Sequence, residues 1–184
     1  MRNVLRRIAF GVLGTGMVVT MAAGAATATA SAAVAAPHQA FQQSLVWPTV
    51  MKGAQGNRVR TIQYLLNQSG FAVDVDGKFG SKTESEVKEF QSVNHLKPDG
   101  VVRSETWEAL ILTVKQGAKG YAVKAVQDYL NRAYGASLKV DGDFGTATTK
   151  AVIKFQDTYK NKYKLMVDGI VGIATWHALV SERG

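Results

Sequence analysis

The 184-residue chain is 46% hydrophobic, a composition typical of globular proteins rather than of disordered ones. It contains no cysteine, which excludes a disulfide framework, a thiolate zinc site and a cysteine nucleophile. The formal net charge of +8 falls to +5 without the N-terminal segment, because three of the 22 Lys and Arg residues lie there and none of the 14 acidic residues does. This balance suits an anionic surface such as a cell wall, a membrane or nucleic acid without choosing among them.

Residues 1–36 have the pattern of a secretory signal peptide. The first seven residues carry three arginines, an uncharged and mostly apolar stretch follows, and the segment ends in small residues up to Ala36. This order predicts export and cleavage near Ala35 or Ala36. The apolar stretch is about long enough to span a bilayer, so an uncleaved anchor is the alternative. Residues 37–45 are short and polar and are expected to form a flexible lead.

After this lead the sequence repeats itself, which predicts a tandem duplication. Residues 50–56 recur as residues 114–120, and the string Val-Asp-Gly-x-Phe-Gly occurs in both copies. Each copy closes alike. The closing matches are Asp99, Gly100, Thr106, Trp107 and Leu110 in the first copy, and Asp168, Gly169, Thr175, Trp176 and Leu179 in the second.

The two copies predict an all-α fold of two tandem three-helix modules, at residues 46–112 and 113–184. In the first copy, apolar residues at helical spacing from Val59 to Leu66 predict the first helix, and residues 67–70 supply a stop. The second copy repeats the pattern. A module of roughly 60 residues buries only about 60% of its unfolded surface, so most of the repeated motif must first serve as scaffold.

Caps and turns predict the remaining elements. Ser81 with Glu84 predicts a capping box at the start of the second helix. A short third helix is expected to begin near Ser104 and to carry Trp107 inward. The Asp-Gly pairs between helices predict tight turns, because Gly accepts the positive φ that such turns require. Phe79 and its counterpart in the second copy are predicted to lock these turns onto the core.

Together these motifs resemble the bacterial peptidoglycan-binding domain that is often attached to wall hydrolases. The resemblance rests on Val-x-x-(Ile/Val)-Gln-x-x-Leu-Asn, Val-Asp-Gly-x-Phe-Gly, Thr-x-x-x-Val-x-x-Phe-Gln, Asp-Gly-x-Val and Thr-Trp-x-x-Leu, in two copies over about Leu45 to Val180. It implies compact three-helix modules that dock on cell-wall glycan or stem peptide and perform no chemistry. One departure is Arg103, where the family pattern and the second copy have glycine, as at Gly172. If that glycine needs a left-handed backbone, the first copy has reshaped its loop.

The repeated polar side chains are the candidate ligand contacts, because they carry the donors and acceptors that amino sugars and peptide amides require. The alternative is that they bond to the module's own loops. The aspartates all precede Gly in repeated turns, which favours turn formation over the paired carboxylates of a glycosidase. The set comprises Gln63, Asn67, Asp76, Gln91 and Asp99 in the first copy and Gln127, Asn131, Asp141, Gln156 and Asp168 in the second.

The second copy is four residues longer between Gln156 and Asp168, where basic and aromatic residues interleave. Such a segment could hold anionic wall polymers through charge and stacking. The alternative is an extended helix end with solvated lysines and tyrosines packed inward. The residues concerned are Tyr159, Lys160, Lys162, Tyr163 and Lys164.

Catalysis is not expected. His38, His95 and His177 form no recognisable metal spacing, and the sequence has neither a Gly-x-Ser-x-Gly elbow nor a phosphate loop. We therefore expect a secreted or wall-associated protein that binds peptidoglycan and has no cofactor, metal, nucleic-acid partner or stable membrane insertion after cleavage. Two modules joined by a few residues would gain effective concentration on a repeating polymer. The alternatives are an exported interaction protein that regulates a wall hydrolase or another partner, and an unrecognised wall hydrolase.

Overall fold

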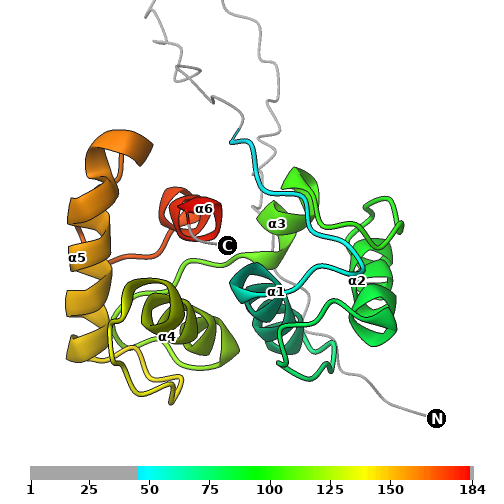
Figure 1. The fold of residues 1–184 in the computed structure, drawn as a ribbon, viewed down its shortest axis with the longest axis horizontal. Coiled ribbons are helices and arrows are strands. Elements are labelled where there is room, and N and C mark those ends of the chain that lie inside the picture. The colour runs from blue at the N-terminus through cyan, green and yellow to red at the C-terminus, as the bar shows by residue number, and fades with distance from the viewer. Residues whose placement is uncertain (1–44, 183–184) are drawn as a thin grey trace, which may run out of the picture. The chain divides into compact units, whose positions relative to one another are not determined.

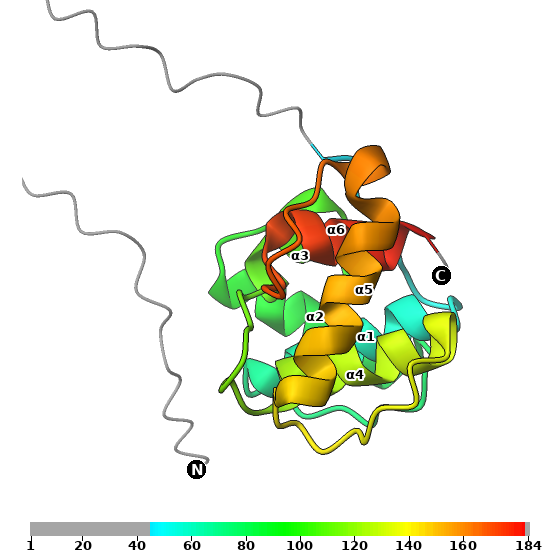
Figure 2. The ribbon, with the colours of Figure 1, turned by 90° about the vertical axis from the view of Figure 1, so that its left-hand side faces the viewer.

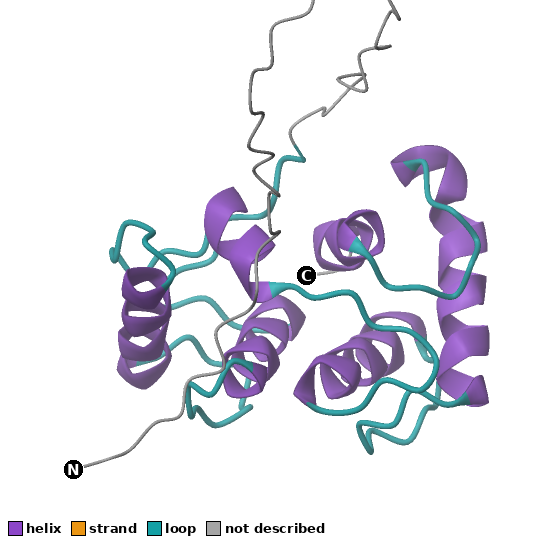
Figure 3. Cartoon of the chain, turned by 180° about the vertical axis from the view of Figure 1, so that it is seen from behind, coloured by secondary structure: helices purple, strands orange, loops and turns teal. Residues whose placement is uncertain are grey.

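The computed structural model describes residues 45–182, which form six helices and no strand (Figures 1 and 3). This confirms the all-α fold with three helices in each module. The helices are α1 (Asn57–Gln68), α2 (Ser81–Val93), α3 (Ser104–Leu110), α4 (Tyr121–Tyr134), α5 (Thr146–Tyr163) and α6 (Ile173–Glu182). The predicted signal peptide and nearly all of the lead lie outside the described residues. Within residues 45–182, no helix combines the length and apolarity needed to cross a membrane.

Each module closes around a fully buried tryptophan, as predicted for the third helix. The indole Nε1 of Trp107 donates to the carbonyl oxygen of Pro48 at 2.8 Å, and that of Trp176 donates to the carbonyl oxygen of Leu112 at 2.9 Å. The segment that enters each module is thereby fixed to its last helix. Isolated antiparallel bridges strengthen the same junctions, between Val50 and Val102 and between Val114 and Val171.

Helix α2 begins differently from the prediction. Gly80, not Ser81, is the N-cap residue, and no side chain caps the helix, so the predicted capping box is wrong. The carbonyl oxygen of Gly80 accepts from the backbone N–H of Glu84 at 3.0 Å. Phe79 fixes this start, because its ring is buried and its backbone N–H donates to the carbonyl oxygen of Ala54 at 2.9 Å. Ser81 therefore lies inside the helix, one position too late to cap it.

The two modules share one hydrophobic core, with α1 packed along α4 (Figures 1 and 2). The backbone N–H of Ala122, at the start of α4, donates to Oε1 of Gln68 at 3.1 Å. Trp47 stacks on Trp107 at a ring separation of 5.8 Å and meets His177 edge-on at 5.1 Å, so it contacts both modules. The short connection between modules thus joins halves that also pack on each other.

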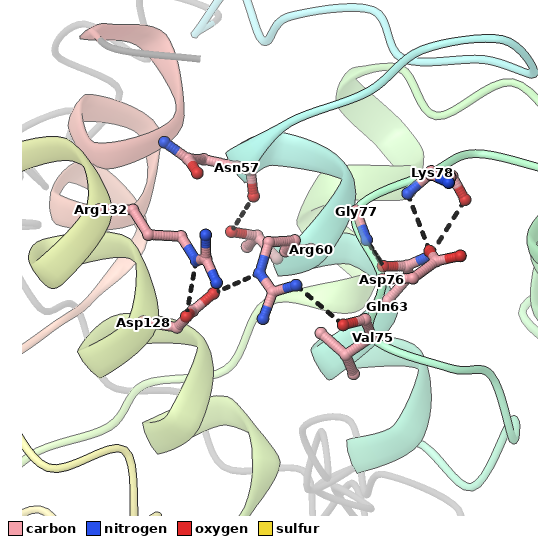
Figure 4. A network of polar contacts seen from close by, with 10 residues as sticks. Asn57, Arg60, Gln63, Val75, Asp76, Gly77, Lys78, Asp128 and Arg132 are labelled. Atoms are coloured by element: carbon pink, nitrogen blue, oxygen red, sulfur yellow. Dashed lines mark hydrogen bonds and ion pairs between the residues drawn. The ribbon is translucent and has the colours of Figure 1, made fainter.

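A buried carboxylate on α4 pairs with two arginines, one of which lies on α1 of the other module (Figure 4). Asp128 on α4 is 7% exposed, and its Oδ2 accepts from Nε of Arg60 on α1 at 2.7 Å. Its Oδ1 accepts from Nε of Arg132 at 2.8 Å. Arg60 also donates to the carbonyl oxygen of Val75 at 2.8 Å. The ion pair therefore joins α4 of the second module to both α1 and the following loop of the first.

Candidate ligand-binding surface

One hydrogen-bonded unit fixes the loop between α1 and α2 (Figure 4). The amide Nε2 of Gln63 donates to Oδ1 of Asp76 at 2.8 Å, to the carbonyl oxygen of Lys78 at 3.1 Å and to Oγ1 of Thr83 at 3.3 Å. Its Oε1 accepts from the backbone N–H of Gly77 at 2.8 Å. Asp76 Oδ1 also accepts from the backbone N–H of Lys78 at 2.8 Å. A single buried glutamine thus joins one helix, the Asp-Gly turn and the next helix.

The same unit occurs three more times, once in each remaining loop that follows a helix inside a module. In every case a buried glutamine accepts from the glycine N–H of an Asp-Gly pair and donates to a threonine on the next helix. Gln127 and Gln156 also donate to the turn aspartate, at 3.0 and 3.1 Å. The three units are Gln91, Asp99, Gly100 and Thr106; Gln127, Asp141, Gly142 and Thr148; and Gln156, Asp168, Gly169 and Thr175.

Three of the four predicted glutamines contact their predicted aspartates, and Gln91 bonds the glycine that follows Asp99, but all four lie inside the module. The four glutamines are at most 1% exposed. Asn67 and Asn131 also bond to the loops of their own modules. Their Nδ2 atoms donate at 2.7 Å to the carbonyl oxygens of Val73 and Leu138, respectively. Among the predicted residues, the exposed ones are three turn aspartates, and Asp99 is half-buried. The exposed aspartates are Asp76, Asp141 and Asp168. Ligand contact by the ten residues stays a prediction.

The threonines were missing from the predicted set. Each follows its turn aspartate by seven residues, as Thr83 follows Asp76. This constant spacing is the sequence signal that could have identified the threonines. It places a hydroxyl on the first turn of the next helix, facing the glutamine amide. Every module is therefore built from two successive copies of one glutamine–turn–threonine unit.

Arg103 does not reshape the loop of the first module. Its backbone is extended, with φ −116° and ψ −169°, and the counterpart Gly172 is not among the left-handed glycines of the described residues. The position therefore accepts a side chain without strain. Arg103 uses it to donate from Nη1 to Oδ2 of Asp99 at 2.8 Å. The two modules differ here in charge rather than in backbone.

The lysine and tyrosine segment of the second module is an extended helix end. Helix α5 has 18 residues where α2 has 13. Tyr159 packs against Phe155 and Tyr134 at ring separations of 5.0 and 5.8 Å. Tyr163 donates from its hydroxyl to Oε1 of Glu182 at 2.6 Å, and Lys162 pairs with the same carboxylate. This confirms the extended helix end with tyrosines packed inward, whereas contact of its lysines with anionic wall polymers stays a prediction.

The turn aspartates make stability depend on pH. Backbone N–H groups, followed by the Gln63 amide, lower the pKa of Asp76 below its ordinary value of 3.8, and the pKa of Asp141 is lowered likewise. A lowered folded pKa stabilises the folded state above pH 3.8, and this contribution is lost as the pH falls through 3.8 and below. We expect Asp141→Asn to reduce the loss of stability between pH 5 and pH 3, measured by urea unfolding. The control is Asp74→Asn, at an exposed aspartate. An equal reduction of the stability loss in the control would contradict the assignment of this pH dependence to the turn aspartates.

Known proteins are similar to parts of this chain. An uncharacterized protein of Kitasatospora aureofaciens is 34% identical over 107 residues, which cover 57% of this chain and 86% of that protein. The zinc D-Ala-D-Ala carboxypeptidase of Streptomyces albus G is 27% identical over 110 residues, which cover 58% of this chain and 43% of the carboxypeptidase. A crystal structure of a peptidoglycan-binding protein from Clostridioides difficile matches at 36% identity and a TM-score of 0.34, over 34% of this chain and 40% of that one.

A family model also matches, once in each module. The model describes a peptidoglycan binding domain, and it matches residues 55–110 and residues 119–179. The first match runs from the bridge before α1 to the end of α3. The second covers the equivalent part of the other module and ends within α6. The chain therefore belongs to the peptidoglycan binding domain family and carries two copies of the domain.

Proposed function

We propose that this protein binds cell-wall peptidoglycan through its two modules without cleaving it. The observation that carries the proposal is the duplicated family domain, which accounts for most of the described residues. The matched region covers 43% of the carboxypeptidase relative, so more than half of that enzyme lies outside it. The likeness to that enzyme therefore supports attachment to the wall rather than catalysis.

Export fits this role, because the ligand lies outside the cytoplasm. Residues 1–36 would direct secretion and be removed near Ala35 or Ala36, which leaves the protein extracellular or wall-associated. The remaining charge of +5 favours a wall whose peptides carry carboxylates.

The shared core gives the two modules a fixed relation on the polymer. The buried glutamines hold the Asp-Gly turns, and Asp76, Asp141 and Asp168 keep exposed side chains that can accept hydrogen bonds from sugar hydroxyls or peptide amides. Two weak sites at a fixed distance bind a repeating polymer with effective concentrations in about the millimolar range, so the avidity exceeds either single affinity by about 10²-fold or more.

Co-sedimentation with purified sacculi tests the proposal. We expect saturable pelleting of the protein with sacculi and none with cellulose, a glycan that has neither amides nor peptides. Sacculi stripped of anionic wall polymers should pellet the protein as well as untreated sacculi do. Failure to pellet, together with recovery of a stoichiometric protein partner, would instead support the exported interaction protein.

A further inference from the structure

The second module contains a cavity between α5 and the loop that joins α4 to α5. Its volume is about 470 Å³, within the range of about 300–1,000 Å³ that is common for small-molecule sites. Figure 2 shows this loop, in yellow, running beside the two helices. Apolar walls dominate the cavity, and they include Leu130, Tyr134, Ala136, Leu138, Ala151 and Phe155.

The first module fills the equivalent place with a phenylalanine. Phe71 donates its backbone N–H to the carbonyl oxygen of Leu66 at 2.9 Å, and Ala136 donates to that of Leu130 at 3.2 Å, so the two residues hold the same position. The Phe71 ring is buried and meets Phe90 edge-on at 5.6 Å. Alanine at this position has no ring, and the second module has the cavity beside it, where Tyr134 meets Phe155 edge-on at 5.1 Å.

Two lysines give the cavity its charge. Lys150 and Lys154 lie one helical turn apart on α5, and both line the cavity. Both are exposed, and neither forms an ion pair among the described residues. The lining residues include no Asp, Glu, Asn or Gln. The two lysines suit a carboxylate, and the apolar walls suit small apolar groups, so a ligand that combines both matches the lining.

We propose that this cavity binds a short peptide that carries small apolar side chains and ends in a free carboxylate. The carboxylate would pair with Lys150 and Lys154, and the methyl groups would lie against Ala151 and Phe155. The inference rests on the proposed function, because the stem peptides of peptidoglycan have this chemistry. It assigns peptide recognition to the second module and excludes the first, where Phe71 occupies the space.

Titration with N-acetyl-D-alanyl-D-alanine, followed by NMR of the protein, tests the site. We expect saturable shifts at Leu130 and Leu138, binding roughly tenfold weaker for the C-terminal amide of the same peptide, and no binding of N-acetylglucosamine at the cavity. Ala136→Phe should abolish peptide binding by restoring the residue of the first module. The double variant Lys150→Gln with Lys154→Gln should lower the affinity for the peptide acid to that for the peptide amide. Lys115→Gln, an exposed change elsewhere in the module, should leave the affinity unchanged.

The outcomes separate this inference from the proposed function. Equal binding of acid and amide, or binding that Ala136→Phe leaves intact, would overturn the cavity assignment. The lysine pair lies on the surface, so that variant keeps the test valid even if Ala136→Phe does not fold. Sacculi that pellet the protein while the peptide acid fails to bind would overturn the cavity and leave the proposed function standing. Sacculi that do not pellet the protein would overturn the proposed function itself.

Discussion

Gln63→Leu is expected to lower the free energy of unfolding by about 3–5 kcal/mol, because it removes the centre of a buried hydrogen-bonded unit. The Gln63 amide makes four hydrogen bonds, to Asp76, Gly77, Lys78 and Thr83. Leucine has a similar volume, so the effect reports lost polar contacts rather than a cavity. The buried Gly77 N–H is left without its acceptor, which alone costs about 1–3 kcal/mol.

Urea unfolding at pH 7, followed by circular dichroism, measures this effect. Gln116→Leu is the matched control, since Gln116 is an exposed glutamine in a loop of the second module and its replacement should change stability by less than about 0.5 kcal/mol. If the two variants lose stability equally, the buried glutamines do not hold the Asp-Gly turns.

Asp128→Ala is expected to cost about 2–4 kcal/mol, because it leaves Arg60 without its partner at the packed junction between modules. The side chains of Arg60 and Asp128 are only 17% and 11% exposed, so water replaces little of the lost interaction. Arg132 loses the same carboxylate. Since the carboxylate joins α1 to α4, the loss should fall on the contact between the modules.

Asp143→Ala is the control for this variant. Asp143 forms an exposed ion pair with Lys119, with side chains 57% and 76% exposed, and such pairs contribute about 0–1 kcal/mol. Thermal unfolding of both variants supplies the comparison. A melting temperature of Asp128→Ala no lower than that of Asp143→Ala would contradict a structural role for the Arg60–Asp128–Arg132 link.

The helices and the turns could be predicted from the sequence because their signals are local. Apolar spacing from Val59 to Leu66 and the Asp-Gly pairs depend on neighbouring residues, and the buried Trp107 marks the third helix. The capping box at Ser81 failed although its pattern is also local. The long-range lock of Phe79 onto the segment before α1 fixes where α2 begins, and spacing within the helix carries no information on that contact.

The candidate site was less predictable, because its contacts connect distant residues. The repeated glutamines and aspartates stood out in the sequence, but only the fold shows that the Gln63 amide forms its hydrogen bonds inside the module. The cavity depended on a comparison of the two copies at a single position, Phe71 against Ala136, in a loop where the second copy is one residue longer. The link between Asp128 and Arg60 lies outside the repeated motif, so duplication gave no hint of it.

The most direct test of the central claim is one incubation of the protein with purified sacculi, in which pelleted protein and released muropeptides are both measured. Binding without catalysis predicts protein in the pellet and no soluble fragments above those of a protein-free sample. Soluble muropeptides that increase with protein concentration would contradict the account, because they would make this chain a wall hydrolase.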